Sequence, residues 1–307
     1  MVAALLASGT FAACTSDLPE SEGLSGTVVV DGSSTLTPLL RAVADELVVD
    51  VEPGVTVDLT TSGTGAGIER LCAGVVDVAM ASRPITVEEE AGCAEAGVEP
   101  VEVPVGLDAV SVVVPRRNDY VDCLTVAELA SLWGATGPAP ATWQDVREDW
   151  PSTALALFSP GPSSATTTSL AEVVLDGSPQ RLDVATSEDD EVVVQGVAAS
   201  PGGLGYVPLG YALGGEEDVR VVAVDAGDGC VEPSAGTATD GSYPMSRPLQ
   251  VYVSRQAYTD RAAVVALVRV LVARGPRAAE EARGVPPTAQ QQQAAAVALA
   301  KLGPGPG

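Results

Sequence analysis

Short runs rich in Val alternate along the chain with segments whose apolar residues recur at helical spacing. The first strand-turn-helix unit has a strand at Thr27–Val30 and a helix with Pro38 in its first turn, where the N–H groups have no helical partner. Two further units place strands at Val55–Leu59 and Ala154–Phe158 before helices at Ile68–Ala73 and Thr168–Leu175. This alternation predicts an α/β fold with a parallel sheet.

The turns within these units are unusually rich in Gly, Ser and Thr. They are Asp31–Thr35, Thr61–Gly67 and Pro160–Thr166. Each lies where a helix exposes free N–H groups and the positive end of its dipole, which suits an anion. Ordinary N-capping explains any one turn. Three such turns in one chain favour a tetrahedral oxyanion ligand.

A candidate cation follows a further predicted strand that ends at Ala81-Ser82-Arg83. Ligands of open α/β sheets bind at the carboxyl ends of the strands. The guanidinium fork of Arg83 suits bidentate contact with phosphate-like oxygens. We therefore expect Arg83 to bind the anion, rather than to be an ordinary surface arginine.

Composition limits the chemistry more than it limits the fold. The 307 residues are enough for two domains, and the hydrophobic fraction of 46% is enough to form their cores. The formal net charge of -25 disfavours nucleic acid as a partner. There is no His and the only lysine is Lys301, so histidine-based catalysis, a P-loop and a Schiff base are excluded. No motif predicts a metal or an organic cofactor. The acidic runs Glu88–Glu90 and Glu188–Glu191 are interpreted as solvated faces.

The first residues predict export. Residues 1–13 form a short apolar run of small residues, too short to span a membrane, and resemble a secretory signal of the lipoprotein type that would be cleaved before Cys14. The expected lipid anchor is therefore on Cys14, followed by a linker over residues 14–25. An ordinary signal with an incidental cysteine is the alternative. The remaining Cys72, Cys93, Cys123 and Cys230 suit disulfides in an oxidising compartment, with buried free thiols as the alternative.

Five segments together resemble the phosphate-binding proteins of phosphate ABC importers, over about Gly26–Leu302. The segments are Asp31–Thr35, Ser62–Gly65, Ala81–Ile85, Gly203–Tyr206 and Tyr243–Leu249. The resemblance implies a two-lobed periplasmic-binding-protein fold of type II, with the ligand in the cleft. Crossings between lobes are expected near Asp108–Val114 and Arg247–Val253. The implied first lobe is 26–108 with 248–302, the second is 109–247, and 303–307 is expected to be a disordered tail.

The resemblance also implies a ligand set and a disulfide pairing. Pairs Cys72–Cys93 and Cys123–Cys230 would each lie within one lobe. The implied phosphate contacts, with the turn residues beside them, are Ser34, Thr35, Leu36, Ser62, Gly63, Thr64, Arg83, Ser164, Ala165 and Thr166. Three positions depart from the pattern of the related sequences. Ala165 replaces the usual Gly, Ser163 stands where Asp is frequent, and Glu191 stands where Asn is frequent. No residue identifies the acceptor for the proton that distinguishes phosphate from sulfate.

These features predict a binding protein rather than an enzyme. The expected function is capture of inorganic phosphate outside the cytoplasm, by a lipid-anchored monomer that delivers it to the permease subunits of an ABC transporter. The first alternative is a binding protein or sensor for another oxyanion, such as sulfate or molybdate. The second is a carboxylate-dependent hydrolase, which the absence of paired carboxylates at strand ends disfavours.

Overall fold

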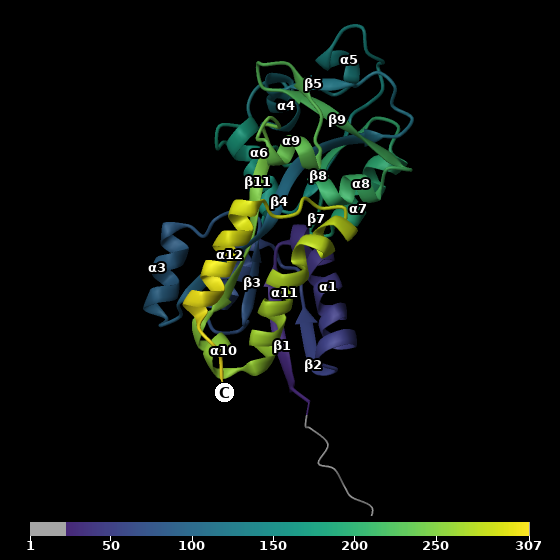
Figure 1. Ribbon diagram of the computed structural model, residues 1–307. Helices are drawn as coiled ribbons and strands as arrows, with labels where there is room; N and C mark the ends of the chain where they lie inside the picture. Colours follow the sequence, from purple (N-terminus) through teal and green to yellow (C-terminus); the bar gives the residue numbers. More distant parts are fainter. Residues whose placement is uncertain (1–22, 307) are drawn as a thin grey trace, which may run out of the picture.

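The computed structural model describes residues 23–306, and it divides the buried side chains between two lobes (Figure 1). Predictions for the signal segment, Cys14 and most of the linker fall outside this range. The first lobe contains β1 Ser25–Gly32, η1 Ser34–Leu36, α1 Thr37–Glu46, η2 Leu47–Val51, β2 Gly54–Leu59, α2 Thr64–Cys72, β3 Val78–Ala81, α3 Val87–Glu95, α10 Arg255–Asp260, α11 Ala262–Glu281 and α12 Ala289–Leu302. The first strand-turn-helix units therefore form where the hydrophobic pattern predicts them.

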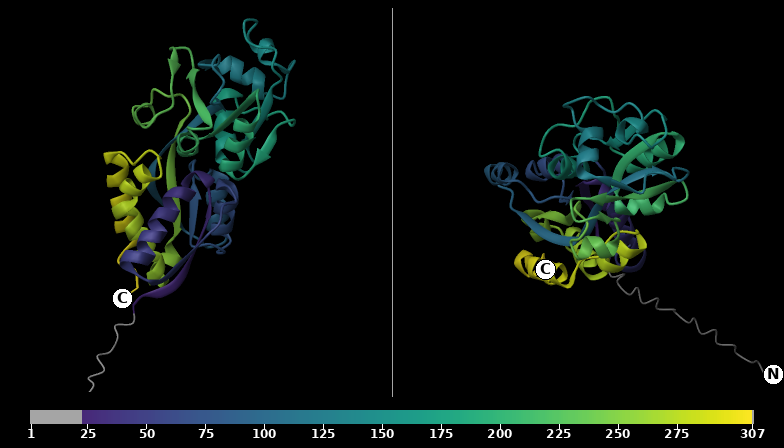
Figure 2. Two further views of the ribbon diagram at one scale, coloured as in Figure 1. Left: turned by 90° about the vertical axis from the view of Figure 1, so that its right-hand side faces the viewer. Right: turned by 90° about the horizontal axis from the view of Figure 1, so that it is seen from above.

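The second lobe carries the middle of the chain, drawn in teal and green above the first lobe in Figure 2. Its elements are β5 Cys123–Thr125, α4 Val126–Trp133, α5 Trp143–Val146, β6 Ala156–Pro160, α6 Ala165–Val174, β7 Ala185–Ser187, α7 Asp190–Ala199, β8 Gly203–Pro208, α8 Leu209–Gly214, β9 Val219–Asp225, β10 Cys230–Val231 and α9 Ala235–Thr239. The predicted unit at Ala154–Leu175 corresponds to β6 and α6.

Two long strands, β4 Pro100–Pro115 and β11 Ser246–Ser254, connect the lobes. The first part of β4 pairs antiparallel with β11, and its last part pairs with β8 and β9 of the second lobe. The sheet order is β2-β1-β3-β11-β4-β8-β6-β7. In the first lobe β1 runs parallel to β2 and β3, and in the second β6 runs parallel to β7 and β8. The expected crossing Asp108–Val114 therefore lies in β4 and the expected crossing Arg247–Val253 lies in β11, and the two strands pair at Asp108 and Arg247.

Each lobe has helices on both faces of its part of the sheet, and the alternation of strand residues shows this in β3. Val78 and Met80 pack in the large core that includes α1 and α11, whereas Ala79 and Ala81 face α2 on the other side. This follows from the two-residue period of a strand. The helix α11 buries one of its sides in this core, including Val264, Leu267, Val268 and Leu271. All three tryptophans are buried in the core of the second lobe.

Both disulfides have the expected pairing. Cys72 on α2 is bonded to Cys93 on α3, and Cys123 on β5 is bonded to Cys230 on β10. The second bridge closes a long loop, so it restricts the unfolded chain more than the first. Gly303 to Pro306, expected to be disordered, follow α12, and Pro304 O accepts a hydrogen bond from Arg269 at 2.8 Å. No helix within residues 23–306 combines the length and hydrophobicity that a membrane span needs.

Candidate functional site

An ion pair lies where the crossing strands meet. The β4–β11 register places Arg247 directly opposite Asp108. Nε and Nη2 of Arg247 donate to Oδ2 of Asp108 at 2.9 and 2.7 Å, and both residues are buried. The other oxygen of Asp108 accepts the Leu209 N–H at 3.0 Å. Desolvation offsets much of the attraction in such a pair, so its main effect is to hold the guanidinium in one orientation.

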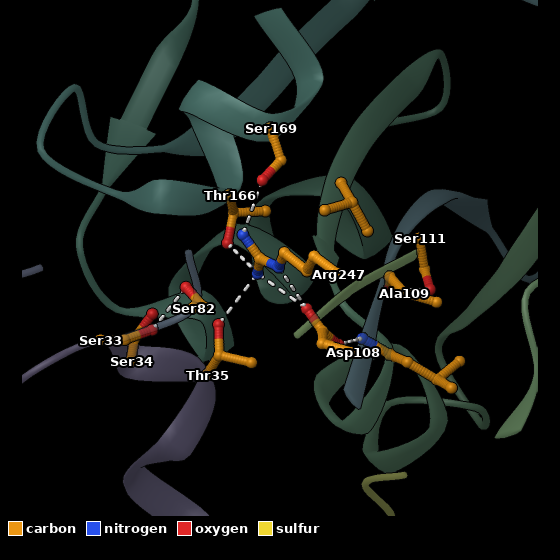
Figure 3. Close-up of polar contacts among 12 residues, drawn as sticks. Ser33, Ser34, Thr35, Ser82, Asp108, Ala109, Ser111, Thr166, Ser169 and Arg247 are labelled. Carbon is orange, nitrogen blue, oxygen red and sulfur yellow. Dashed lines mark hydrogen bonds and ion pairs between the residues drawn. The ribbon is translucent and has the colours of Figure 1, made fainter. Parts of the chain in front are cut away.

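The guanidinium of Arg247 also contacts hydroxyls from both lobes (Figure 3). Its Nη2 donates to Thr35 Oγ1 in the first lobe at 3.0 Å and to Thr166 Oγ1 in the second lobe at 2.7 Å. Nη1 lies 3.4 Å from Ser169 Oγ. Thr166 is in the first turn of α6, whose N-cap Ser164 accepts the Thr166 N–H at 3.1 Å. Two of the predicted anion-binding turns therefore meet at one cation.

A second group of hydroxyls continues from the first turn toward α2. Ser33 and Ser82 share a hydrogen bond of 2.9 Å between their hydroxyls. Thr64, the first residue of α2, accepts the Ser82 N–H at 3.2 Å and lies 3.4 Å from its hydroxyl. All three side chains are buried. The start of α2 is thus joined to the turn that carries Ser34 and Thr35.

Asp31 holds the first two turns together. Its Oδ1 accepts the N–H groups of Gly32 and Ser62 at 2.7 and 3.0 Å, and Oδ2 accepts the Ser62 hydroxyl at 2.7 Å and pairs with Arg70. Burial acts to raise the pKa of Asp31, but the hydrogen bonds from Ser62 and Gly32 outweigh it and lower the pKa below its ordinary value. Ser62 therefore directs both donors to Asp31 in this arrangement, and its predicted ligand contact stays a prediction.

Other predicted contacts also have partners in the protein. Arg83 forms a bidentate pair with Glu89, Nη1 to Oε2 at 2.8 Å and Nη2 to Oε1 at 2.7 Å, and the hydrogen bonds to Glu89 raise the pKa of Arg83. Its guanidinium lies beside Gly65 near the start of α2. The Leu36 N–H donates to Ser33 O at 3.2 Å. The cation that joins the two turns is Arg247, whereas the predicted ligand contact of Arg83 stays a prediction.

The two lobes touch at this site. Gly63, the N-cap of α2, has a φ of +92°, and a Cβ added there would lie 2.6 Å from the carbonyl oxygen of Ser163 in the second lobe. Only glycine permits this approach. From the other side, the Tyr211 hydroxyl of α8 donates to Ser34 O at 3.1 Å. Together with Arg247, these contacts define an arrangement in which the lobes are closed on the site.

One interpretation of the acidic residues is corrected. Glu188–Glu191 was expected to be a solvated face, but Asp190 is only 1% exposed because it begins α7 on the side that faces Ser34. Both Arg247 and Asp190 were absent from the predicted ligand set. The sequence did contain a sign of the role of Arg247, because Asp108 lies within an apolar strand and a buried carboxylate requires a partner. Nothing in the sequence distinguishes Asp190 from the neighbouring acids of its run.

Known proteins of one family match most of the chain. The model of the PBP superfamily domain matches residues 19–273. The phosphate-binding protein PstS of Staphylococcus saprophyticus is 34% identical over 76% of this chain and 72% of its own length. The chain belongs to this family of phosphate-binding proteins. Protein SphX of Synechococcus elongatus is 37% identical over 78% of this chain and 72% of its own length.

The solved structures agree with the fold. The structure of a possible phosphate-binding protein from Planctomyces limnophilus covers 92% of this chain and 100% of its own, with 34% identity and a TM-score of 0.69. The two-lobed α/β fold expected of this phosphate-binding protein family is thereby confirmed. The match covers enough of this chain to include both lobes.

Proposed function

We propose that this protein binds inorganic phosphate between its lobes outside the cytoplasm and delivers it to the permease subunits of an ABC transporter. The observation that carries the proposal is the convergence of Thr35 and Thr166 from opposite lobes on the buried guanidinium of Arg247. A tetrahedral anion has oxygens on all sides, so donors from two lobes can reach it only when the lobes close. Family membership supports phosphate as that anion.

The arrangement accounts for binding of an anion by a chain of net charge -25. Arg247 and Asp108 together are neutral, so most of the attraction comes from hydroxyls and from the starts of α1, α2 and α6. Hydrogen bonds to a charged group contribute roughly 1.5 to 3 kcal/mol each, and micromolar affinity needs about 8 kcal/mol. Exposed acids beyond about 8 Å are screened at physiological salt. The attraction from a handful of donors in contact with the anion is therefore larger than the screened repulsion from the exposed acids.

Export, lipid attachment through Cys14 and a monomeric state belong to the same proposal. The signal-like first residues and the two disulfides support an oxidising compartment outside the cytoplasm. The site holds a guanidinium and hydroxyls but lacks histidine, because the chain has none. We accordingly assign it binding and release, without a chemical step.

Calorimetric titration of the purified chain with phosphate, sulfate and molybdate tests the ligand. We expect micromolar or tighter binding of phosphate at neutral pH, and much weaker binding of the other two anions. The double variant R247M/D108N, which removes the cation without leaving a buried charge, is expected to bind phosphate at least about tenfold more weakly. Tighter binding of sulfate or molybdate than of phosphate would replace the proposed ligand.

A further inference from the structure

The short helix α8 of the second lobe is held at both ends by groups that lie outside that lobe. At its start, the Leu209 N–H donates to Asp108 Oδ1 at 3.0 Å, and Asp108 lies on the connecting strand β4. At its end, Nη1 of Arg283 donates to Leu213 O and lies 3.2 Å from Glu216 Oε1. Arg283 follows α11 of the first lobe. The helix is thereby fixed against the first lobe, and a side chain in its middle has a defined position there.

Tyr211, in the middle of α8, contacts the first of the predicted anion-binding turns. Its hydroxyl donates to Ser34 O at 3.1 Å, a hydrogen bond from the second lobe to the first. Ser34 O also accepts the Thr37 N–H within its own lobe. Tyr211 lines a cavity of about 260 Å³ together with Ser34 and Thr37. The cavity gives water access to this turn, so a variant that lacks the hydroxyl is expected to fold.

The hydroxyl of Tyr211 stays a hydrogen-bond donor at neutral pH. Burial raises the pKa of Tyr211, the acids at the start of α7 raise it further, and Arg41 acts in the opposite direction. The phenol is therefore protonated. A carbonyl oxygen only accepts, so the direction of the bond is fixed from Tyr211 to Ser34.

The bond from Tyr211 orients a whole peptide group. The C=O of Ser34 and the N–H of Thr35 belong to the same planar trans peptide, in which the two groups point in opposite directions. With the carbonyl directed at α8, the Thr35 N–H points away from α8. The hydroxyl of the same Thr35 lies 3.0 Å from Nη2 of Arg247, the cation of the site (Figure 3). Contacts from outside its own turn therefore set both the backbone donor and the hydroxyl of Thr35.

We propose that Tyr211 is a positioning residue of the phosphate site, which holds the Ser34–Thr35 peptide so that the Thr35 N–H donates to phosphate bound beside Arg247. This inference rests on the proposed function. The Tyr211 bond and the anion both join the two lobes, so each stabilises the arrangement that the other needs. Loss of the bond should therefore weaken phosphate binding without weakening the fold of either lobe.

The test compares Y211F with Y243F, a variant that loses a similar bond within a single lobe. The Tyr243 hydroxyl donates to Val110 O at 2.7 Å, and both residues belong to the second lobe. Inorganic phosphate is titrated calorimetrically against wild type and both variants, and each protein is melted without phosphate. For Y211F we expect about three- to tenfold weaker binding, the effect of one neutral hydrogen bond, and a melting temperature close to that of wild type. Y243F should melt at a lower temperature, because a buried carbonyl loses its partner, and should keep its phosphate affinity within about twofold.

A second measurement follows the Thr35 amide directly. In ¹⁵N-labelled protein, an N–H that donates to a phosphate oxygen shifts its proton resonance downfield when phosphate binds. We expect this shift for Thr35 in wild type and in Y243F, and a clearly smaller shift in Y211F saturated with phosphate. A residue that only stabilises the fold would not change the shift once the site is saturated.

Wild-type phosphate affinity in folded Y211F would overturn the assignment. So would a Thr35 shift in Y211F equal to that of wild type, or the lack of any Thr35 shift in wild type that binds phosphate. A lower melting temperature of Y211F with an unchanged Thr35 shift would reduce Tyr211 to a structural residue. Failure of wild type to bind phosphate at all would instead refute the proposed function, so the two hypotheses fail separately.

Discussion

The close approach of Gly63 to Ser163 gives a sharp test of lobe closure, by the substitution G63A. The added Cβ would lie 2.6 Å from the Ser163 carbonyl oxygen, so ordinary contact requires the turns to separate by about 0.8 Å. Thr166 follows Ser163 by three residues, and its 2.7 Å bond to Arg247 would stretch beyond hydrogen-bond length. Loss of one or two such bonds costs roughly 1.5 to 3 kcal/mol each.

We therefore expect G63A to bind phosphate about ten- to ten-thousandfold more weakly by calorimetry. The left-handed φ of +92° adds strain of about 1 to 3 kcal/mol, which should appear as a lower melting temperature. G65A, two residues along, is the matched control, because its Cβ would meet only Arg83 Nη2 at 3.7 Å. G65A should keep its affinity within about threefold. Wild-type affinity in G63A, or an equal loss in G65A, would refute the closed geometry as the binding state.

Two further predictions concern the charges of the site. R247K keeps the charge but loses the guanidinium fork, and it should weaken phosphate binding about tenfold or more. R83A should weaken binding less, because Arg83 is paired with Glu89. If calorimetric titrations rank the two variants in the opposite order, Arg83 and not Arg247 is the main cation for phosphate. D31N should unfold about 2 kcal/mol more easily at pH 7. Because the pKa of Asp31 is lowered in the fold, its contribution is present above the unfolded value of 3.8 and is lost as pH falls through the folded pKa. Melting curves of D31N and wild type should therefore converge in acid, and a constant difference down to pH 3 would contradict this.

The elements of the fold were predictable because the information for them is local. Pro, Gly and hydroxyl residues mark the turns, and the periods of two and 3.6 residues mark the strands and helices between them. The turns at Asp31–Thr35 and Pro160–Thr166 were identified in this way. The two crossings and the lobe arrangement came from the resemblance to a known family and not from the periodicity.

The chemistry of the site depended on contacts far apart in sequence. Thr35 and Arg247 are separated by 212 positions, and only the β4–β11 register brings Asp108 opposite the arginine. Arg83 has the right residue type at a strand end, but Glu89 on the next helix binds its fork. Asp190 lies in a run of acids whose burial is decided by the orientation of α7. Which of these charged residues contacts the site is decided by tertiary structure, and local sequence propensity does not encode that.

The Arg247–Asp108 pair lies on the connecting strands, so orientation of the guanidinium is separate from the supply of hydroxyl groups by the lobes. Thr35 and Thr166 belong to different lobes, whereas both members of the pair lie on the two strands that connect the lobes. The Asp108 carboxylate therefore orients the guanidinium from the connecting strands, independently of the hydroxyls that each lobe adds. Residues of the lobes can then diverge to suit different oxyanions while the connecting strands keep the oriented guanidinium.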